Sequence, residues 1–198
     1  MVRERQERRQ RLFHEVASDQ HGYFTAAQAL DLGYSYQAQA RHVAAGNWLR
    51  VDRGIFRLAE WVPEVHDEFA RWTLWSKERG VISHESALEV HRLGEFESSK
   101  VHLTVPPGFT MTDPALVLHR STLAAEDVVN GGGFRVTSAL RSIIDVAAGG
   151  AELDQLARSI EEATDRGVFT IKQLRARAEE IDLKGALAIE RALALRTS

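Results

Sequence analysis

The chain has 198 residues, of which 44% are hydrophobic and 27% are charged, proportions typical of a globular protein and unlike those of a disordered chain. It contains no cysteine, which excludes disulfides, a thiol nucleophile and zinc sites built from thiolates. No apolar run is long enough to span a membrane, and the charged segment 1–11 is not followed by the apolar core of a signal peptide, so the sequence predicts a cytoplasmic protein.

Charge is unevenly distributed along the chain. The formal net charge is −3, but residues 1–59 hold nine arginines and six acids, a net of +3, whereas residues 60–198 hold sixteen basic and twenty-two acidic residues, a net of −6. A basic first third followed by an acidic remainder suggests that one part contacts a polyanion and the other does not.

The N-terminal segment begins with signals for two helices. The first is predicted over residues 3–18, where apolar residues recur at helical spacing and arginines occupy the remaining faces. Thr25 and Gln28 then form a capping-box pattern, which predicts the start of a second, short helix over residues 26–32.

A third helix follows almost immediately. Gly33 ends the second helix, Ser35 is the predicted N-cap of a helix over residues 36–45, and Gly46 closes that helix. Two short helices joined by a turn of three or four residues have the spacing of a helix-turn-helix.

The next residues favour a β-hairpin. Residues 48–51 and 55–58 are two short β-prone runs, and Asp52-Arg53-Gly54 between them supplies a glycine for the turn. Three helices followed by a hairpin are typical of a winged helix-turn-helix, which we predict over residues 1–60.

The third helix and the hairpin carry side chains suited to DNA recognition. A helix fits the major groove, arginine binds phosphate, and Arg, Gln and Ser contact base edges. Helical periodicity places Val43, and a residue one turn before it, toward the core, and the polar residues outward. The candidate DNA-binding residues are therefore Ser35, Tyr36, Gln37, Arg41, Arg50 and Arg53, with Arg57 as a further possibility.

An alternative interpretation is that this domain binds another protein, because winged helices also serve as interaction modules. Two aromatic residues near the helix are assigned to packing: His42 to a partly buried position and Tyr34 to the core.

The sequence patterns of residues 61–198 predict a mostly helical domain with a small β-sheet. The predicted fold class of the chain is therefore α+β. Helical patterns cover residues 65–77, 83–93, 138–148 and most of the chain beyond 153, including a second capping box at Thr170 and Gln173. Short strands are predicted at residues 100–105, 116–119 and 133–136.

The second domain offers one weak indication of catalysis. His84, Glu85 and His91 resemble the helical zinc signature, but the second histidine stands seven residues after the first rather than four. His102 and His119 are interpreted as ordinary strand residues. A metal-dependent hydrolase is therefore a minor alternative, and we predict no catalytic residue, no metal site and no cofactor.

The order of four motifs resembles a known family. The segments 21–28 (HGYFTAAQ), 46–56 (GNWLRVDRGIF), 83–88 (SHESAL) and 136–145 (VTSALRSIID) together are similar to the AbiEi-type antitoxins of type IV toxin–antitoxin and abortive-infection systems. The match spans nearly the whole chain.

This resemblance implies that the two domains have different functions. The winged helix-turn-helix would bind inverted repeats in the double-stranded DNA of the operon's own promoter, with the six candidate residues at its recognition-helix and wing positions. Residues 61–198 would form an antitoxin domain that opposes a co-encoded nucleotidyltransferase-like toxin, with or without direct contact, and no membrane partner is expected. The alternative is a winged-helix regulator of another operon, whose C-terminal domain senses a ligand or a partner.

Overall fold

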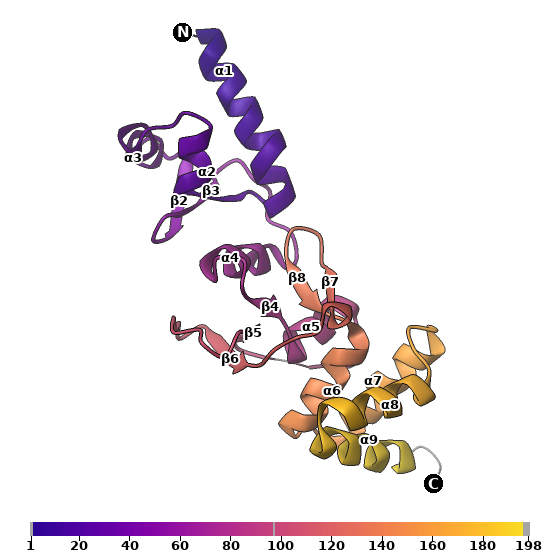
Figure 1. The fold of residues 1–198 in the computed structure, drawn as a ribbon. Coiled ribbons are helices and arrows are strands. Elements are labelled where there is room, and N and C mark those ends of the chain that lie inside the picture. The colour runs from indigo at the N-terminus through magenta and orange to yellow at the C-terminus, as the bar shows by residue number, and fades with distance from the viewer. Residues whose placement is uncertain (1, 97, 196–198) are drawn as a thin grey trace. The chain divides into compact units, whose positions relative to one another are not determined.

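The computed structural model describes residues 2–96 and 98–195, which form two compact units (Figure 1). The N-terminal unit comprises Met1–Arg79 together with Gly132–Phe134, and the C-terminal unit comprises Gly80–Gly131 and Arg135–Ser198.

The helices of the N-terminal unit follow the predicted order. They are α1 (Val2–Arg11), α2 (Ala26–Asp31), α3 (Tyr36–Ala44) and α4 (Asp67–Trp75). The chain continues beyond α1 through a π-helical segment, Leu12–Ala17, and a short 3-10 turn, Ser18–Gln20.

Side-chain caps set the start of both short helices. The Thr25 hydroxyl accepts a hydrogen bond from Gln28 N (3.1 Å), and the Gln28 side chain accepts one from Thr25 N (2.8 Å), which completes the predicted capping box. Ser35 caps α3 by accepting from Ala38 N (3.3 Å). Both predicted helix starts are confirmed.

A three-stranded antiparallel sheet completes the winged helix. Its strands are β1 (Tyr23–Thr25), β2 (Trp48–Asp52) and β3 (Ile55–Leu58), in the order β1-β3-β2. The helices and the sheet enclose a core of eight buried residues: Leu12, Ala17, Phe24, Ala29, Tyr34, Trp48, Phe56 and Leu58.

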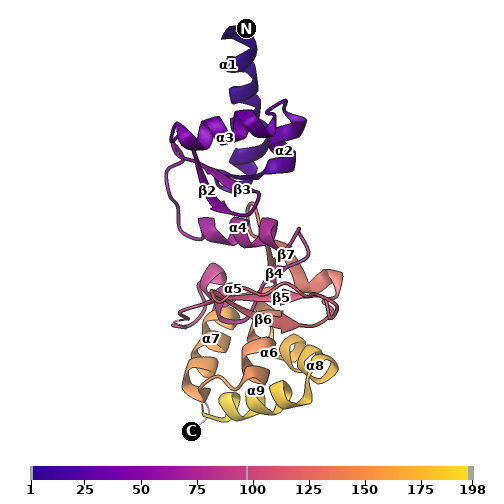
Figure 2. The same cartoon turned by 90° about the vertical axis from the view of Figure 1, so that its left-hand side faces the viewer.

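The C-terminal unit contains a mixed five-stranded sheet of order β6-β5-β4-β8-β7 (Figure 2). Its strands are β4 (Val81–Ile82), β5 (Val101–Val105), β6 (Leu116–Arg120), β7 (Val128–Asn130) and β8 (Arg135–Thr137). The strand β5 pairs antiparallel with β4 and parallel with β6. A short 3-10 turn, Ala125–Asp127, precedes β7.

Five helices of the C-terminal unit bury the larger core. They are α5 (His84–His91), α6 (Ala139–Gly149), α7 (Leu153–Asp165), α8 (Ile171–Ile181) and α9 (Leu183–Leu195). Ile143, Ile144, Leu156, Ile160 and Leu174 are fully buried among them. The α+β class, with a winged helix followed by a mostly helical unit and a small sheet, is confirmed.

The N-terminal unit extends past the winged helix, through α4 to Arg79. The boundary of a DNA-binding domain at residue 60 remains a prediction. In the segments 2–96 and 98–195, no helix is both long and apolar enough to cross a membrane.

Candidate nucleic-acid interface

A buried glutamine fixes α3 against α2. Gln39 is 2% exposed, and its Nε2 donates hydrogen bonds to Tyr34 O (2.9 Å) and Ala26 O (3.0 Å). These bonds tie the recognition helix to the turn before it and to the first turn of α2. Because a buried amide needs such partners, these two bonds help to set the orientation of α3.

The start and the outer side of α3 are exposed. The N-cap Ser35 and the helix residues Tyr36, Gln37 and Arg41 are all accessible, and Tyr36 is 69% exposed. Gln37 and Arg41 are one turn apart, and Arg41 Nε approaches Gln37 O at 3.4 Å. The structure therefore gathers the four helix residues proposed from the sequence on one accessible surface.

Ser35 has a second role at this surface. Its Oγ accepts from Ala38 N as the N-cap of α3, which leaves the hydroxyl proton free to donate. The first backbone N–H groups of a helix lack intrahelical partners, so the N-terminus of α3 suits a phosphate oxygen.

The hairpin between β2 and β3 carries the two wing arginines. Arg50 lies on β2 and Arg53 at the turn, and both are exposed. Gly54 adopts φ +73, and its carbonyl accepts a hydrogen bond from Ala26 N (2.8 Å), which anchors the turn to the start of α2. Among the residues that the structure describes, Arg41, Arg50 and Arg53 form no ion pair.

Arg57 does not belong to this surface. Its Nη2 lies 3.1 Å from Asp67 Oδ2 of α4, and its side chain is 15% exposed. Because a carboxylate from α4 already pairs with its guanidinium, Arg57 is a weaker candidate for a DNA contact than Arg50 and Arg53, and its contact with DNA stays a prediction.

Two aromatic residues pack as the sequence predicted. The ring of His42 stacks on Trp48, with centroids 4.6 Å apart, and burial lowers the pKa of this imidazole. Tyr34 is 7% exposed and contacts the same tryptophan edge-on. Both support the core beneath α3.

The histidines of the C-terminal unit do not form the arrangement weighed from the sequence. His91 Nε2 lies 2.7 Å from Thr137 O, whereas His84 lies against His102 and His119, so these two are not the ordinary strand residues that the sequence indicates. Burial, followed by the neighbouring His119, lowers the pKa of His84 to about 3. Burial likewise lowers the pKa of His119 to about 4, so both rings are neutral at pH 7.

Comparison with known families bears on the N-terminal unit. Residues 14–59 match the family described as "Transcriptional regulator, AbiEi antitoxin". The AbiEi match includes α2, α3 and the β2–β3 hairpin, and thus all six candidate residues lie within it.

A comparison of folds covers more of the chain. The crystal structure of the RV2827C protein from Mycobacterium tuberculosis is similar over 94% of this chain and 77% of that one, with a TM-score of 0.61 and 11% sequence identity. At this identity the likeness shows a shared fold only. No curated protein matches the chain.

Proposed function

We propose that the protein is an antitoxin that binds double-stranded DNA through α3 and the β2–β3 wing and represses its own promoter. The observation that carries the proposal is the exposure of Ser35, Tyr36, Gln37, Arg41, Arg50 and Arg53 on a winged helix of the AbiEi family. No catalytic step is proposed.

The chemistry of this surface favours DNA over a protein partner. Arg41, Arg50 and Arg53 carry positive charge that no described acid neutralises, and such arginines bind the phosphates beside a groove. Gln37 and Arg41 present donors one turn apart on α3, a spacing that suits adjacent base edges in the major groove.

The second part of the proposal concerns the toxin. The family match and the resemblance over the rest of the chain support a C-terminal unit that opposes a co-encoded nucleotidyltransferase-like toxin. Co-expression with the neighbouring gene tests this part. Rescue of growth by the wild-type protein supports it, and rescue by the Arg41→Ala variant would show that toxin antagonism does not require DNA binding.

Fluorescence anisotropy with the DNA directly upstream of the gene tests the first part. We expect this duplex to be bound more tightly than a scrambled duplex of equal length, with an affinity that falls as salt rises. Arg41→Ala and Arg53→Ala should weaken binding, and each lost phosphate contact should reduce the salt slope by about 0.9. Gln37→Ala should reduce the preference for the specific duplex, at a cost of about 1–3 kcal/mol if it contacts a base edge.

Arg158→Ala is the matched control for the loss of one positive charge. Arg158 lies on α7 and its side chain is 58% exposed. Its replacement should leave DNA affinity unchanged. Equal binding of the two duplexes, or equal losses in the Arg41 and Arg158 variants, would contradict the proposal.

Specific binding to a different promoter, without rescue from a neighbouring toxin, would favour a regulator of another operon.

A further inference from the structure

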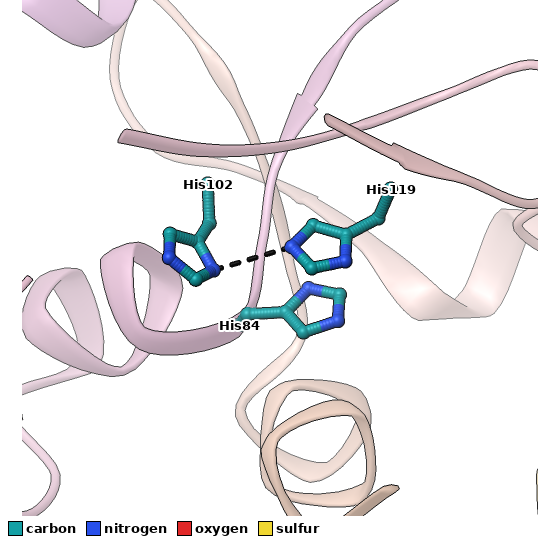
Figure 3. A group of neighbouring side chains, drawn as sticks. All are labelled: His84, His102 and His119. Carbon is teal, nitrogen blue, oxygen red and sulfur yellow. Dashed lines mark hydrogen bonds between the residues drawn. The ribbon is translucent and has the colours of Figure 1, made fainter. Parts of the chain in front are cut away.

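Three histidines of the C-terminal unit meet in one small volume. His84 is the first residue of α5, His102 lies on β5 and His119 on β6. Figure 3 shows the three rings turned toward one another, and one nitrogen of each lies within 4.8 Å of the others.

Strand pairing explains how two of the rings meet. In the parallel register of β5 and β6, His102 is opposite Val117, and His119 is two residues further along β6. Side chains two residues apart in a strand point to the same face. His102 and His119 therefore share a face of the sheet, with His102 Nδ1 and His119 Nε2 only 3.2 Å apart.

The start of α5 is joined to His102 by its backbone. Ser83 N donates to His102 O (3.0 Å), and His102 N donates to Ser86 Oγ (3.0 Å). These two bonds hold His84, between the two serines, beside β5. The cluster is thus fixed by backbone geometry rather than by the histidines alone.

The second nitrogen of His84 is already oriented. Its Nδ1 lies 3.0 Å from Ser83 Oγ, which in turn accepts a hydrogen bond from Thr104 Oγ1 (2.8 Å). In metal sites a hydrogen bond to one imidazole nitrogen fixes the ring so that the other can act as a ligand. The Nε2 of His84 is the nitrogen left for this purpose.

A partly buried carboxylate lies beside the rings. Glu85 Oε2 is 2.6 Å from His102 Nδ1 and pairs with it, and the Glu85 side chain is 28% exposed. An ion bound by the three imidazoles would be positively charged, and this neighbouring carboxylate would offset part of that charge.

From this geometry we propose that His84, His102 and His119 bind a divalent transition-metal ion of the zinc class. Tetrahedral zinc with Zn–N bonds of about 2.0–2.1 Å places its ligand atoms about 3.3 Å apart, close to the separation of His102 and His119. The ring of His84 stacks on His119, with centroids 3.4 Å apart, and must separate from it for Nε2 to reach the ion. Glu85 supplies negative charge next to the ion, and the site joins α5, β5 and the edge strand β6.

A second group with metal-ligand atoms, His21, Glu64 and Asp67 in the N-terminal unit, supports no such proposal. The Arg57 guanidinium already lies 3.1 Å from Asp67 Oδ2 and provides the positive charge at that position.

Zinc and cobalt binding to the full-length, untagged protein tests the proposal and does not depend on DNA binding. After treatment with EDTA, we expect about one equivalent of Zn²⁺ in competition with a chromogenic chelator, and Co²⁺ should give the intense visible bands of tetrahedral coordination. His119→Gln should weaken binding by about 100-fold or more, and Glu85→Gln by about 10–100-fold.

His91→Gln is the matched control, because His91 lies on α5 outside the cluster and glutamine can still reach Thr137 O. It should bind Zn²⁺ like the wild type. If His119→Gln fails to fold, the cobalt spectrum of the wild type and the affinity of Glu85→Gln decide the question. Absence of stoichiometric binding, octahedral cobalt bands, or an equal loss in His91→Gln would overturn the proposal.

Discussion

Gln39 provides a quantitative test of how α3 is held. In Gln39→Leu a side chain of similar size remains, but the hydrogen bonds to Tyr34 O and Ala26 O are lost. Each such bond contributes about 0.5–1.5 kcal/mol net, so their loss costs about 1–3 kcal/mol. Leucine recovers part of this by burying more apolar surface, and we expect a net loss of about 1–2 kcal/mol.

Gln39→Glu separates hydrogen bonding from packing. Its shape is that of glutamine, but an ionised carboxylate cannot donate and would face two carbonyl oxygens in a buried site. We expect a loss greater than about 3 kcal/mol at pH 7, because a buried charge would lack a partner. Acidification should reduce this loss, since the protonated carboxyl can donate one of the two bonds.

Tryptophan fluorescence can follow the unfolding of the N-terminal unit alone. All four tryptophans, Trp48, Trp61, Trp72 and Trp75, belong to the N-terminal unit, so tryptophan fluorescence during urea unfolding reports on that unit. The controls are Gln37→Leu and Gln37→Glu, because Gln37 is exposed on the same helix. If the Gln39 variants unfolded at the same urea concentrations as their Gln37 counterparts, the buried amide would not be what holds α3.

Two further variants test backbone strain and buried charge. A Cβ on Gly22 (φ +80) would lie 2.4 Å from the Trp61 ring, whereas one on Gly46 (φ +73) would meet nothing within 4 Å. Gly46→Ala should therefore cost about 1 kcal/mol, and Gly22→Ala about 1–3 kcal/mol more in the same fluorescence assay, while equal losses would show that Trp61 yields freely. Burial, opposed by Arg141, raises the pKa of Asp145 to about 6. The folded state then binds this proton more tightly than the unfolded state, so stability falls as pH rises through 6. Asp145→Asn should remove about 1.4 kcal/mol of the change between pH 5 and pH 8, measured by circular dichroism, and an unaltered pH profile would exclude this assignment.

Patterns among residues close together in the sequence were sufficient to predict the helices and the hairpin of the winged helix. The capping boxes at Thr25 and Thr170 each involve residues three apart, and a pattern of that range can be identified without knowing what packs against it. The hairpin is equally local, because its turn needs only a glycine with positive φ at position 54. Short strands such as β1 and β4 were missed, because their pairing comes from distant segments.

The histidine cluster could not be predicted for the same reason. His102 and His119 share a face only because β5 and β6 pair in parallel in one particular register, and no local pattern specifies that register. Ser83 shows a related limit. It occupies the N-cap position of α5, but its hydroxyl contacts His84 and Thr104 instead of capping the helix.

The positive charge that residues 1–59 can offer to DNA depends on which of their arginines pair with acidic residues. Among the arginines of residues 1–59 whose side chains the structure describes, Arg57 pairs with Asp67 of α4 and Arg9 with Glu60 just after β3. Both acids come from beyond residue 59, so the +3 of the isolated segment overstates the charge that the folded unit offers to DNA. On α3 and the wing, Arg41, Arg50 and Arg53 stay exposed. An interface of this kind depends on the placement of Arg41, Arg50 and Arg53, and less on the net charge of the chain.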